Sequence, residues 1–374
     1  MTMIANQPIN PKAQKDWHIH ATLLPDGDRA QDWWIYDGVL HEQPIADAET
    51  LPGKYAIAGM VDAHTHLSMD FGLFGLPEAS DAVIRANLAH KATHGVLAVR
   101  DVGALPGAKI DPATSSDVRV LTTGNLNAPT ERFHPGIYTP VEADQLIDSA
   151  LHDLARGSRW VKVIADFPGP DFNFFDPIVN YSFETLQQLC NAVHAKGARV
   201  AAHVSGSYVA EVVRAGIDSI EHGPMLTADV LAEMAWRGIA WTPTLTTVTR
   251  VCAMQVEMGV PYAASIKQYL AQLKHTLPLA EKLGVQILVG TDEYPDSYAD
   301  EVQLLHKYGL SVKGALLSAS DSARAYLGLP WLKEGEAADL VLFDEDPRDA
   351  LNRLAQPSAI IANGRKLEIR KSDF

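Results

Sequence analysis

The sequence has few cysteines, no cluster of basic residues and no long apolar run. Its two cysteines, Cys190 and Cys252, are far apart, so neither a redox pair nor a cysteine zinc site is available, and we interpret them as buried thiols in a reducing compartment. No segment approaches the about 18 consecutive apolar residues of a membrane span. The N-terminus MTMIANQPINPKAQKDW lacks the apolar core of a signal peptide. These absences predict a soluble, cytoplasmic protein with no membrane partner.

Basic residues are too few and too dispersed to bind a phosphate backbone. The 374 residues carry a formal net charge of −15 at pH 7, which would repel nucleic acid. We therefore expect a small-molecule substrate and no nucleic-acid partner, and the sequence leaves a homo-oligomer open. Hydrophobic residues make up 47% of the chain, enough for a globular core that needs no disulfide.

Short segments of β character stand at both ends of the chain. They are residues 18–25, 32–40, 54–59, 338–347 and 359–369. Gly and Asp turn signals separate those near the N-terminus, and a polar, partly helical link joins those near the C-terminus. We predict that the two ends form one small sheet domain from residues 1–56 and 331–374, with a separate central domain at 57–330.

The central part alternates short apolar runs with helical patterns, as parallel βα units do. The eight runs are residues 59–66, 95–103, 118–125, 160–166, 198–206, 217–223, 238–246 and 285–293. Helical stretches such as 182–197 and 208–216 end in glycine, as a helix C-cap does. We predict an α/β fold, a closed (β/α)8 TIM barrel rather than an open doubly wound sheet. No glycine-rich phosphate turn follows the first run, and polar residues stand at the C-terminal ends of several runs, where barrels keep their chemistry.

Two histidines end the first run. His64 and His66 are two residues apart, so both imidazoles point to the same side of a strand, which in a barrel is the interior. Such a pair supplies half of a metal site. The alternative is a His-Thr-His turn with both rings in solvent.

Lys162 lies inside the otherwise apolar run WVKVIAD. Burying an ammonium in a parallel strand is costly, so something must neutralise the lysine or use it. A carboxylate partner is the simpler alternative, and taken alone the pattern favours it. The other is that nearby metal ions lower its pKa and the amine takes up carbon dioxide. The resulting carbamate has two oxygens that can bridge two cations.

Three more ligand-type residues end later runs: His203 the fifth, His222 the sixth and Asp292 the eighth. Each alone has a simpler interpretation, as a hydrogen-bonded core histidine or as a helix cap. In a closed barrel, however, they ring one opening with the first-run histidines and the fourth-run lysine. So many polar groups left unpaired would be expensive, and two bound cations remove that cost.

Several pieces, in this order, resemble the amidohydrolase superfamily, most closely its imidazolonepropionase-like and prolidase-like branch. They are GMVDAHTHL, VRDVG, WVKVIAD, AAHVSG, SIEHG, TPTL and VGTD, then Glu301, GLSVKGALLSASDSARAYLGL, EGEAADLVLFDEDP and IIANGRKL. The resemblance runs from about residue 55 to the C-terminus. It implies a barrel with a small β-sandwich built from both termini. We interpret Asp101, in VRDVG, as a structural residue.

The resemblance also implies a binuclear metal centre. The implied ligands are His64, His66 and Asp292 for the more buried cation, His203 and His222 for the second, and Lys162, carboxylated by carbon dioxide, as the bridge. Zn²⁺ is the preferred metal, with Mn²⁺ and Co²⁺ as alternatives, because mixed nitrogen and oxygen ligands suit several cations.

The expected activity is hydrolysis of an amide or amide-like C–N bond in a dipeptide, an N-acyl amino acid or a cyclic amide. A metal-bridging hydroxide would attack the carbonyl carbon, and Asp292 would carry the proton to the leaving nitrogen. An ester, a lactone or a carbamate could react at the same site. Ring deamination is disfavoured because no Glu closely follows His203. An inactive binding scaffold is also disfavoured, because such proteins lose metal ligands that this chain retains.

The chain departs from the family after the third run. Family members often carry a Gly-Gly-His-Gly turn there, whereas this sequence reads TTGNLNAPTERFHPGIY. His134 is a candidate to touch substrate or stabilise an oxyanion, with an ordinary loop histidine as the alternative. Tyr138 and Arg132 are weaker substrate-binding candidates. The loop at 166–181 is a candidate to line the substrate pocket, and Glu293 is a candidate to attract a cationic group of the substrate.

Overall fold

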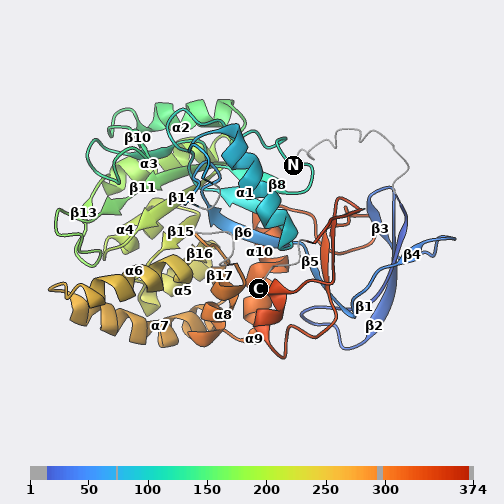
Figure 1. Cartoon of the computed structure of the whole chain (residues 1–374). Helices are drawn as coiled ribbons and strands as arrows, with labels where there is room; N and C mark the ends of the chain where they lie inside the picture. The colour runs from blue at the N-terminus through green and yellow to red at the C-terminus, as the bar shows by residue number, and fades with distance from the viewer. Residues whose placement is uncertain (1–14, 73–74, 293–297, 370–374) are drawn as a thin grey trace.

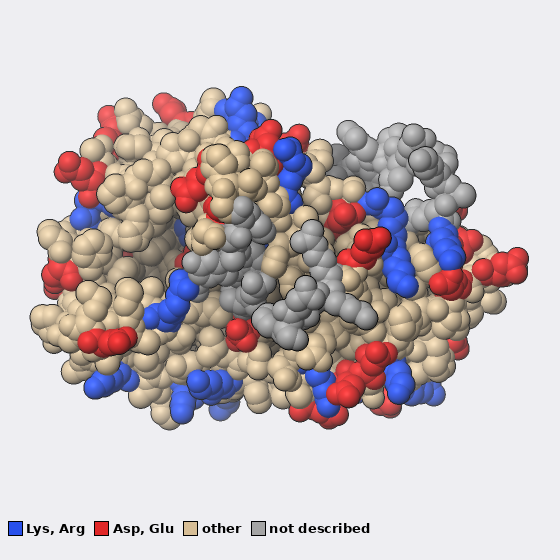
Figure 2. All heavy atoms as spheres, viewed as in Figure 1, with Lys and Arg blue, Asp and Glu red and all other residues tan. Residues whose placement is uncertain are grey.

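The structure is a computed structural model that describes residues 15–72, 75–292 and 298–369. It consists of a larger α/β part and a smaller sheet that lies at one side of it (Figure 1). None of the described helices is long and apolar enough to cross a membrane. On the face in Figure 2, Lys and Arg side chains are scattered singly among Asp and Glu.

One eight-stranded sheet is assembled from both ends of the chain. Its strands in spatial order are β20 (Arg365–Lys366), β19 (Ala359–Ala362), β18 (Leu340–Phe343), β5 (Tyr55–Ala58), β1 (Trp17–Leu23), β2 (Ala30–Tyr36) and β3 (Val39–His41), and β4 (Glu49–Thr50) pairs with β1. Alternate residues of β1, namely Trp17, Ile19 and Ala21, are buried in an apolar cluster, as the period of a strand requires. The antiparallel pairing of β18 with β5 joins the two ends of the chain.

The predicted sheet from both termini is therefore confirmed. The described strands from the two ends pair into one sheet, so the second layer of a β-sandwich stays a prediction. The domain boundaries also stay predictions.

All eight apolar runs of the central part contain strands. These are β6 (Met60–Thr65), β7 (Val96–Asp101), β8 (Arg119–Thr122), β11 (Trp160–Ile164), β14 (Arg199–Val204), β15 (Ser219–His222), β16 (Ala240–Thr242) and β17 (Gln286–Ile287). Two short strands, β9 (Leu126–Ala128) and β10 (Thr139–Pro140), accompany them. The strands form a parallel sheet β6-β7-β8 and a second parallel sheet β10-β9-β11-β14-β15-β16-β17.

Backbone contacts connect the edges of these two sheets. At one edge, the Ala63 amide in β6 donates to the Val289 carbonyl, just after β17, at 2.8 Å. On the other side, the chain runs from β8 directly into β9 of the second sheet, and Ala104 after β7 forms a parallel bridge with Asn125 in the short segment between these two strands. The fold is thus an α/β arrangement of the TIM-barrel type, and the carboxyl ends of its strands face the same side.

The helices pack outside these strands (Figure 1). They are α1 (Asp81–Thr93), α2 (Leu146–Ala155), α3 (Phe183–His194), α4 (Val209–Ala215), α5 (Ala228–Arg237), α6 (Leu245–Glu257), α7 (Ala263–Leu283), α8 (Tyr298–Lys307), α9 (Val312–Ala319) and α10 (Asp321–Leu327), with a 3-10 helix at Leu351–Ala355. Helices α4, α5 and α7 end at Gly216, Gly238 and Gly284 in the left-handed conformation, so the glycine C-caps expected from the sequence are confirmed.

The long connection after β11 carries its own hairpin. Strands β12 (Asp166–Phe167) and β13 (Ile178–Val179) pair antiparallel. Arg132, from the connection after β8, donates from Nη2 to the Phe167 and Ile178 carbonyls at 2.9 Å each. These bonds hold the two long connections together at the carboxyl ends of the strands.

Candidate metal centre

Six side chains that the sequence analysis selected line one cavity of about 260 Å³. They are His64, His66, Lys162, His203, His222 and Asp292. They come from the carboxyl ends of β6, β11, β14 and β15 and from the segment after β17, which lie beside one another in Figure 1. The predicted convergence of distant residues therefore occurs in the structure.

Three of these side chains already point at a common position. The Nε2 atoms of His64 and His66 lie 3.3 Å and 3.4 Å from the same oxygen, Oδ1 of Asp292. One donor atom from each residue falls within 4.8 Å of the others. The Asp292 amide donates to the His64 carbonyl at 2.8 Å, which fixes the carboxylate beside β6. Two imidazoles and a carboxylate at this spacing fit a divalent cation.

The opposite nitrogen of each of these two imidazoles is already engaged. His66 Nδ1 lies 2.9 Å from the Gly103 carbonyl, which can only accept, so Nδ1 carries a proton and Nε2 is the nitrogen that faces Asp292. His64 Nδ1 lies 2.6 Å from Oε2 of Glu221. A partner on the far nitrogen selects the tautomer that a metal-binding histidine needs.

The other two imidazoles follow the same pattern. His203 Nε2 lies 3.1 Å from Ser205 Oγ, and His222 Nδ1 lies 2.7 Å from Thr244 Oγ1. Their ring centroids are 4.6 Å apart, and that of His222 is 5.0 Å from His64. Burial lowers the pKa of His222 to about 3 and that of His203 well below its usual value. Both rings are therefore neutral, the form that binds a cation.

Lys162 differs from the other five predicted ligands in its hydrogen bonding. It is 1% exposed, and its Nζ has no hydrogen-bond partner among the residues that the structure describes. Burial lowers its pKa to about 8, although Glu221 and Asp292 act in the opposite direction. The simpler alternative, a hydrogen-bonded carboxylate partner, is thus not what the described residues provide. A buried amine that is partly uncharged near neutral pH, in one cavity with four imidazoles and the Asp292 carboxylate, fits a binuclear site.

Glu221 is a functional residue that the sequence analysis missed. Its side chain is fully buried and accepts hydrogen bonds from His64, from Arg100 Nη2 at 2.7 Å and from Ser219 Oγ at 2.6 Å. Burial alone would raise its pKa, but Arg100, Lys162 and His64 hold the pKa well below its usual range. Glu221 is therefore an ionised acceptor that positions His64.

Asp62 fixes the backbone of His64 and the neighbouring Thr291. Its carboxylate accepts from Lys91 Nζ at 2.6 Å, from Thr291 Oγ1 at 2.7 Å and from the His64 amide at 3.1 Å. Asp101 accepts from the Leu67 and Gly103 amides, which agrees with the structural role expected for it. A charged residue inside an apolar run was the signal that identified Lys162, and Asp62, Arg100 and Glu221 carry the same signal.

The backbone is strained at three positions around the site. His222, Thr244 and Asp292 have φ angles of 68°, 50° and 50°, in the left-handed region that residues other than glycine seldom adopt. Such a conformation costs about 1–3 kcal/mol per residue and persists where the surroundings enforce it. Two of the three are predicted ligands and the third is hydrogen bonded to one, so the strain coincides with the site.

The predicted substrate-binding residues are placed differently from one another. His134 lines the cavity, and burial lowers its pKa. Tyr138 is buried in an apolar cluster with Leu126 and Phe167 and is not among the lining residues. Arg132 is engaged with the hairpin described above. Glu293 lies outside the described residues, so its predicted role is untouched by the structure.

Comparison with known proteins gives the family. The amidohydrolase family profile matches residues 55–367. The chain belongs to the amidohydrolase family. This amidohydrolase is 31% identical over 357 residues to an uncharacterised protein from Mycobacterium tuberculosis, covering 93% of this chain and 95% of the relative. It is 26% identical over 223 residues to ochratoxinase from Aspergillus niger, covering 55% and 45% of the two chains.

Solved structures share the fold of this amidohydrolase. A Bifidobacterium longum structure described as a prolidase aligns with a TM-score of 0.79 at 23% identity, covering 94% of each chain. The crystal structure of A. niger ochratoxinase aligns with a TM-score of 0.78 at 20% identity, covering 94% and 96%. The resemblance read from the sequence motifs is thereby confirmed. Amidohydrolases generally use divalent metals, and the His64, His66 and Asp292 cluster is a candidate site for one.

Proposed function

We propose that this amidohydrolase hydrolyses an amide-type C–N bond at a centre of two divalent cations. One observation carries the proposal. Two imidazole nitrogens converge on one oxygen of Asp292, and in the same cavity the buried Nζ of Lys162 has no hydrogen-bond partner among the described residues. Family membership supports a hydrolase that acts on C–N bonds. We also infer that the two parallel sheets form one closed (β/α)8 barrel, because a hydrogen bond links β6 to the segment after β17 and the chain passes directly from β8 into β9.

The six cavity residues divide into two ligand sets. His64, His66 and Asp292 would hold one cation, His203 and His222 the other, and Lys162 as a carbamate would bridge them. Zn²⁺ is the preferred metal, with Mn²⁺ and Co²⁺ as alternatives for such mixed ligands. Bound there, the cations would supply a water that is acidic near neutral pH and would polarise the substrate carbonyl.

The side chains of this protein would transfer the proton of the attacking water and orient the metal-binding histidines. Asp292 is ionised, because the contacts with His64 and His66 hold its pKa well below the usual value despite its burial. It can accept the proton of the attacking water on one oxygen and deliver it to the leaving nitrogen. Glu221 keeps His64 in the tautomer whose Nε2 is free. His134 lines the same cavity and would donate to an oxygen of the substrate.

The experiment is a hydrolysis screen with metal-loaded protein. Candidate substrates are dipeptides, N-acyl amino acids, neutral amides, lactones and ureas. We expect turnover of at least one C–N substrate, and we expect Asp292→Asn and Lys162→Ala to abolish it while circular dichroism shows an intact fold. Near-wild-type turnover in either variant refutes the role assigned to that residue.

A further inference from the structure

The cavity above the six predicted ligands has apolar walls. Helix α6 contributes one face, with the helical spacing of Thr247, Val248, Val251, Cys252 and Gln255. The connections after β8 and β11 contribute aromatic rings, among them Phe133, Phe174 and Phe175. A substrate that reaches the ligands must therefore lie against aliphatic and aromatic side chains.

Above the predicted metal ligands, the described walls offer no lysine or arginine to an acidic substrate. Among the described residues that line the cavity, the only lysine or arginine is Lys162, and it belongs to the ligand cluster. The internal residues that the structure does not describe, 73–74 and 293–297, have the sequences LF and EYPDS and contain no lysine or arginine. The chain as a whole is also acidic, with a net charge of −15.

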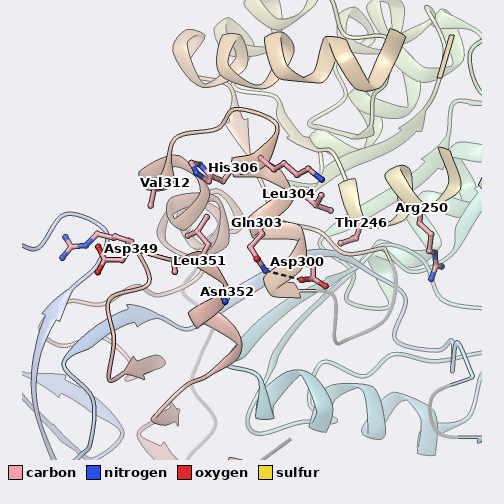
Figure 3. A pocket seen from close by; sticks show the side chains of 13 residues that line it. Thr246, Arg250, Asp300, Gln303, Leu304, His306, Val312, Asp349, Leu351 and Asn352 are labelled. Carbon is pink, nitrogen blue, oxygen red and sulfur yellow. Dashed lines mark hydrogen bonds between the residues drawn. The ribbon is translucent and has the colours of Figure 1, made fainter. Parts of the chain in front are cut away.

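The arginines of the surrounding elements are used elsewhere. Arg132 donates to the Asn180 side chain and to two carbonyls of the hairpin. Arg100 lies fully buried with Glu221, away from the cavity wall. Arg250, on α6, lines a separate cavity of about 950 Å³ together with Asp300 and His306 (Figure 3). The two cavities share no lining residue.

We propose that the substrate is an uncharged amide that carries an aromatic or branched apolar group and no free carboxylate beside the scissile bond. This inference rests on the proposed function and narrows it. Of the three substrate types expected from the sequence, it disfavours dipeptides and N-acyl amino acids, which carry a carboxylate, and keeps uncharged amides such as cyclic amides. An apolar group gains free energy when these walls remove it from water. A carboxylate would lose its water shell and find no lysine or arginine on the described walls above the ligands to compensate. A volume of about 260 Å³ restricts the substrate to a small molecule.

A matched pair of compounds tests this inference. N-acetylphenylalanine and N-acetylphenylalaninamide share the N-acetyl amide bond, whose cleavage is followed by the release of acetate, and they differ only in a carboxylate or a carboxamide. With zinc-loaded wild-type protein, we expect kcat/KM for the carboxamide to be at least about tenfold higher. A preference for the carboxylate overturns the inference and leaves the proposed hydrolysis intact.

A binding measurement separates the pocket from the chemistry. Metal-free Lys162→Met protein has no lysine or arginine on the described cavity walls, and calorimetry can compare the two compounds on it. We expect the carboxamide to bind at least about tenfold more tightly. If neither compound is hydrolysed and this preference persists, the proposed function fails while the pocket assignment stands. Equal or reversed affinity overturns the pocket assignment.

A gain-of-charge variant gives a second test. Val251 is half-buried on the lining face of α6. We expect Val251→Arg to shift the kcat/KM ratio toward N-acetylphenylalanine by at least about tenfold, because the carboxylate then has a partner. Val251→Met, which adds comparable length without charge, should keep the preference for the carboxamide. The same shift in both variants would mean that space rather than charge controls selection, and would overturn the inference.

Discussion

Glu221→Gln tests how this protein prepares a histidine for metal binding. The carboxylate accepts from three donors: Arg100, Ser219 and His64 Nδ1. A glutamine has one acceptor oxygen, which Arg100 and Ser219 would engage, so its NH2 group would face His64. The imidazole must then accept at Nδ1 and carry its proton on Nε2, the nitrogen that points at Asp292. The substitution is nearly isosteric, yet it selects the tautomer that cannot bind a cation.

The expected size of the effect follows from these contacts. Loss of a histidine-orienting partner typically costs about 10–100-fold in metal affinity, which is about 1.4–2.7 kcal/mol at about 1.4 kcal/mol per factor of ten. Stability should fall as well, because Arg100 is fully buried and loses its charged partner. Breaking a buried ion pair costs about 3–5 kcal/mol, and the retained amide oxygen should keep the loss at the lower end.

Zinc titration against a competing chelator measures the affinity, and urea unfolding of the metal-free protein measures the stability. Ser219→Ala is the matched control, because it removes one hydrogen bond to Glu221 but leaves His64 and Arg100 in contact with the carboxylate. It should cost about 1 kcal/mol of stability with unchanged zinc affinity. Wild-type zinc affinity in Glu221→Gln would refute the orienting role of Glu221.

Three further outcomes are expected. Lys162→Met should raise the free energy of unfolding of the metal-free protein by about 1–3 kcal/mol, because it removes a buried ammonium without a hydrogen-bond partner; a loss of stability in urea titrations would mean that Lys162 is structurally paired. Removal of metal by a chelator should lower the melting temperature, by an amount equivalent to about 4 kcal/mol of stability when free metal was at a thousandfold excess over Kd. In Asp292→Asn the chelator should lower the melting temperature by less. An unchanged wild-type melting curve contradicts metal binding. Burial raises the pKa of Glu301 to about 7, above its value in the unfolded chain, so the native state retains a proton that the unfolded state releases. The stability from this group is present below about pH 4.5 and is lost as pH rises to about 7, by up to about 3 kcal/mol. Glu301→Gln should therefore flatten the pH dependence of urea unfolding across this window, and an unchanged slope would contradict the raised pKa.

The parts of the fold that follow from periodicity could be predicted from the sequence. Alternating apolar runs and helical patterns located all eight parallel strands, because burial on both faces leaves a continuous apolar run. The β-type segments at the two ends predicted a shared sheet, and the pairing of β18 with β5 forms it. Two details could not be predicted. One is that β8 pairs with β7 whereas β9, a few residues later, pairs with β11; the other is the hairpin β12–β13. Both depend on loop geometry, which is set by tertiary contacts such as those of Arg132.

Most side chains that line the cavity could also be predicted from residue spacing in the sequence. His64 and His66 stand at the spacing that puts both on one side of a strand, and Lys162 interrupts an apolar run. Glu221 interrupts the run IDSIEHG in the same manner, but it was not predicted, because the neighbouring His222 was taken as the ligand-type residue of that run. The direction of a loop side chain could not be predicted: of the candidates after β8, His134 enters the cavity and Tyr138 packs into an apolar cluster.

Anomalous diffraction from crystals of the zinc-loaded protein tests the central claim most directly. We predict two zinc peaks about 3.5–4 Å apart, one bonded to His64, His66 and Asp292 and the other to His203 and His222, with added density on Lys162 Nζ between them. Absence of zinc from this cavity, or a single zinc beside an unmodified Lys162, would contradict the account.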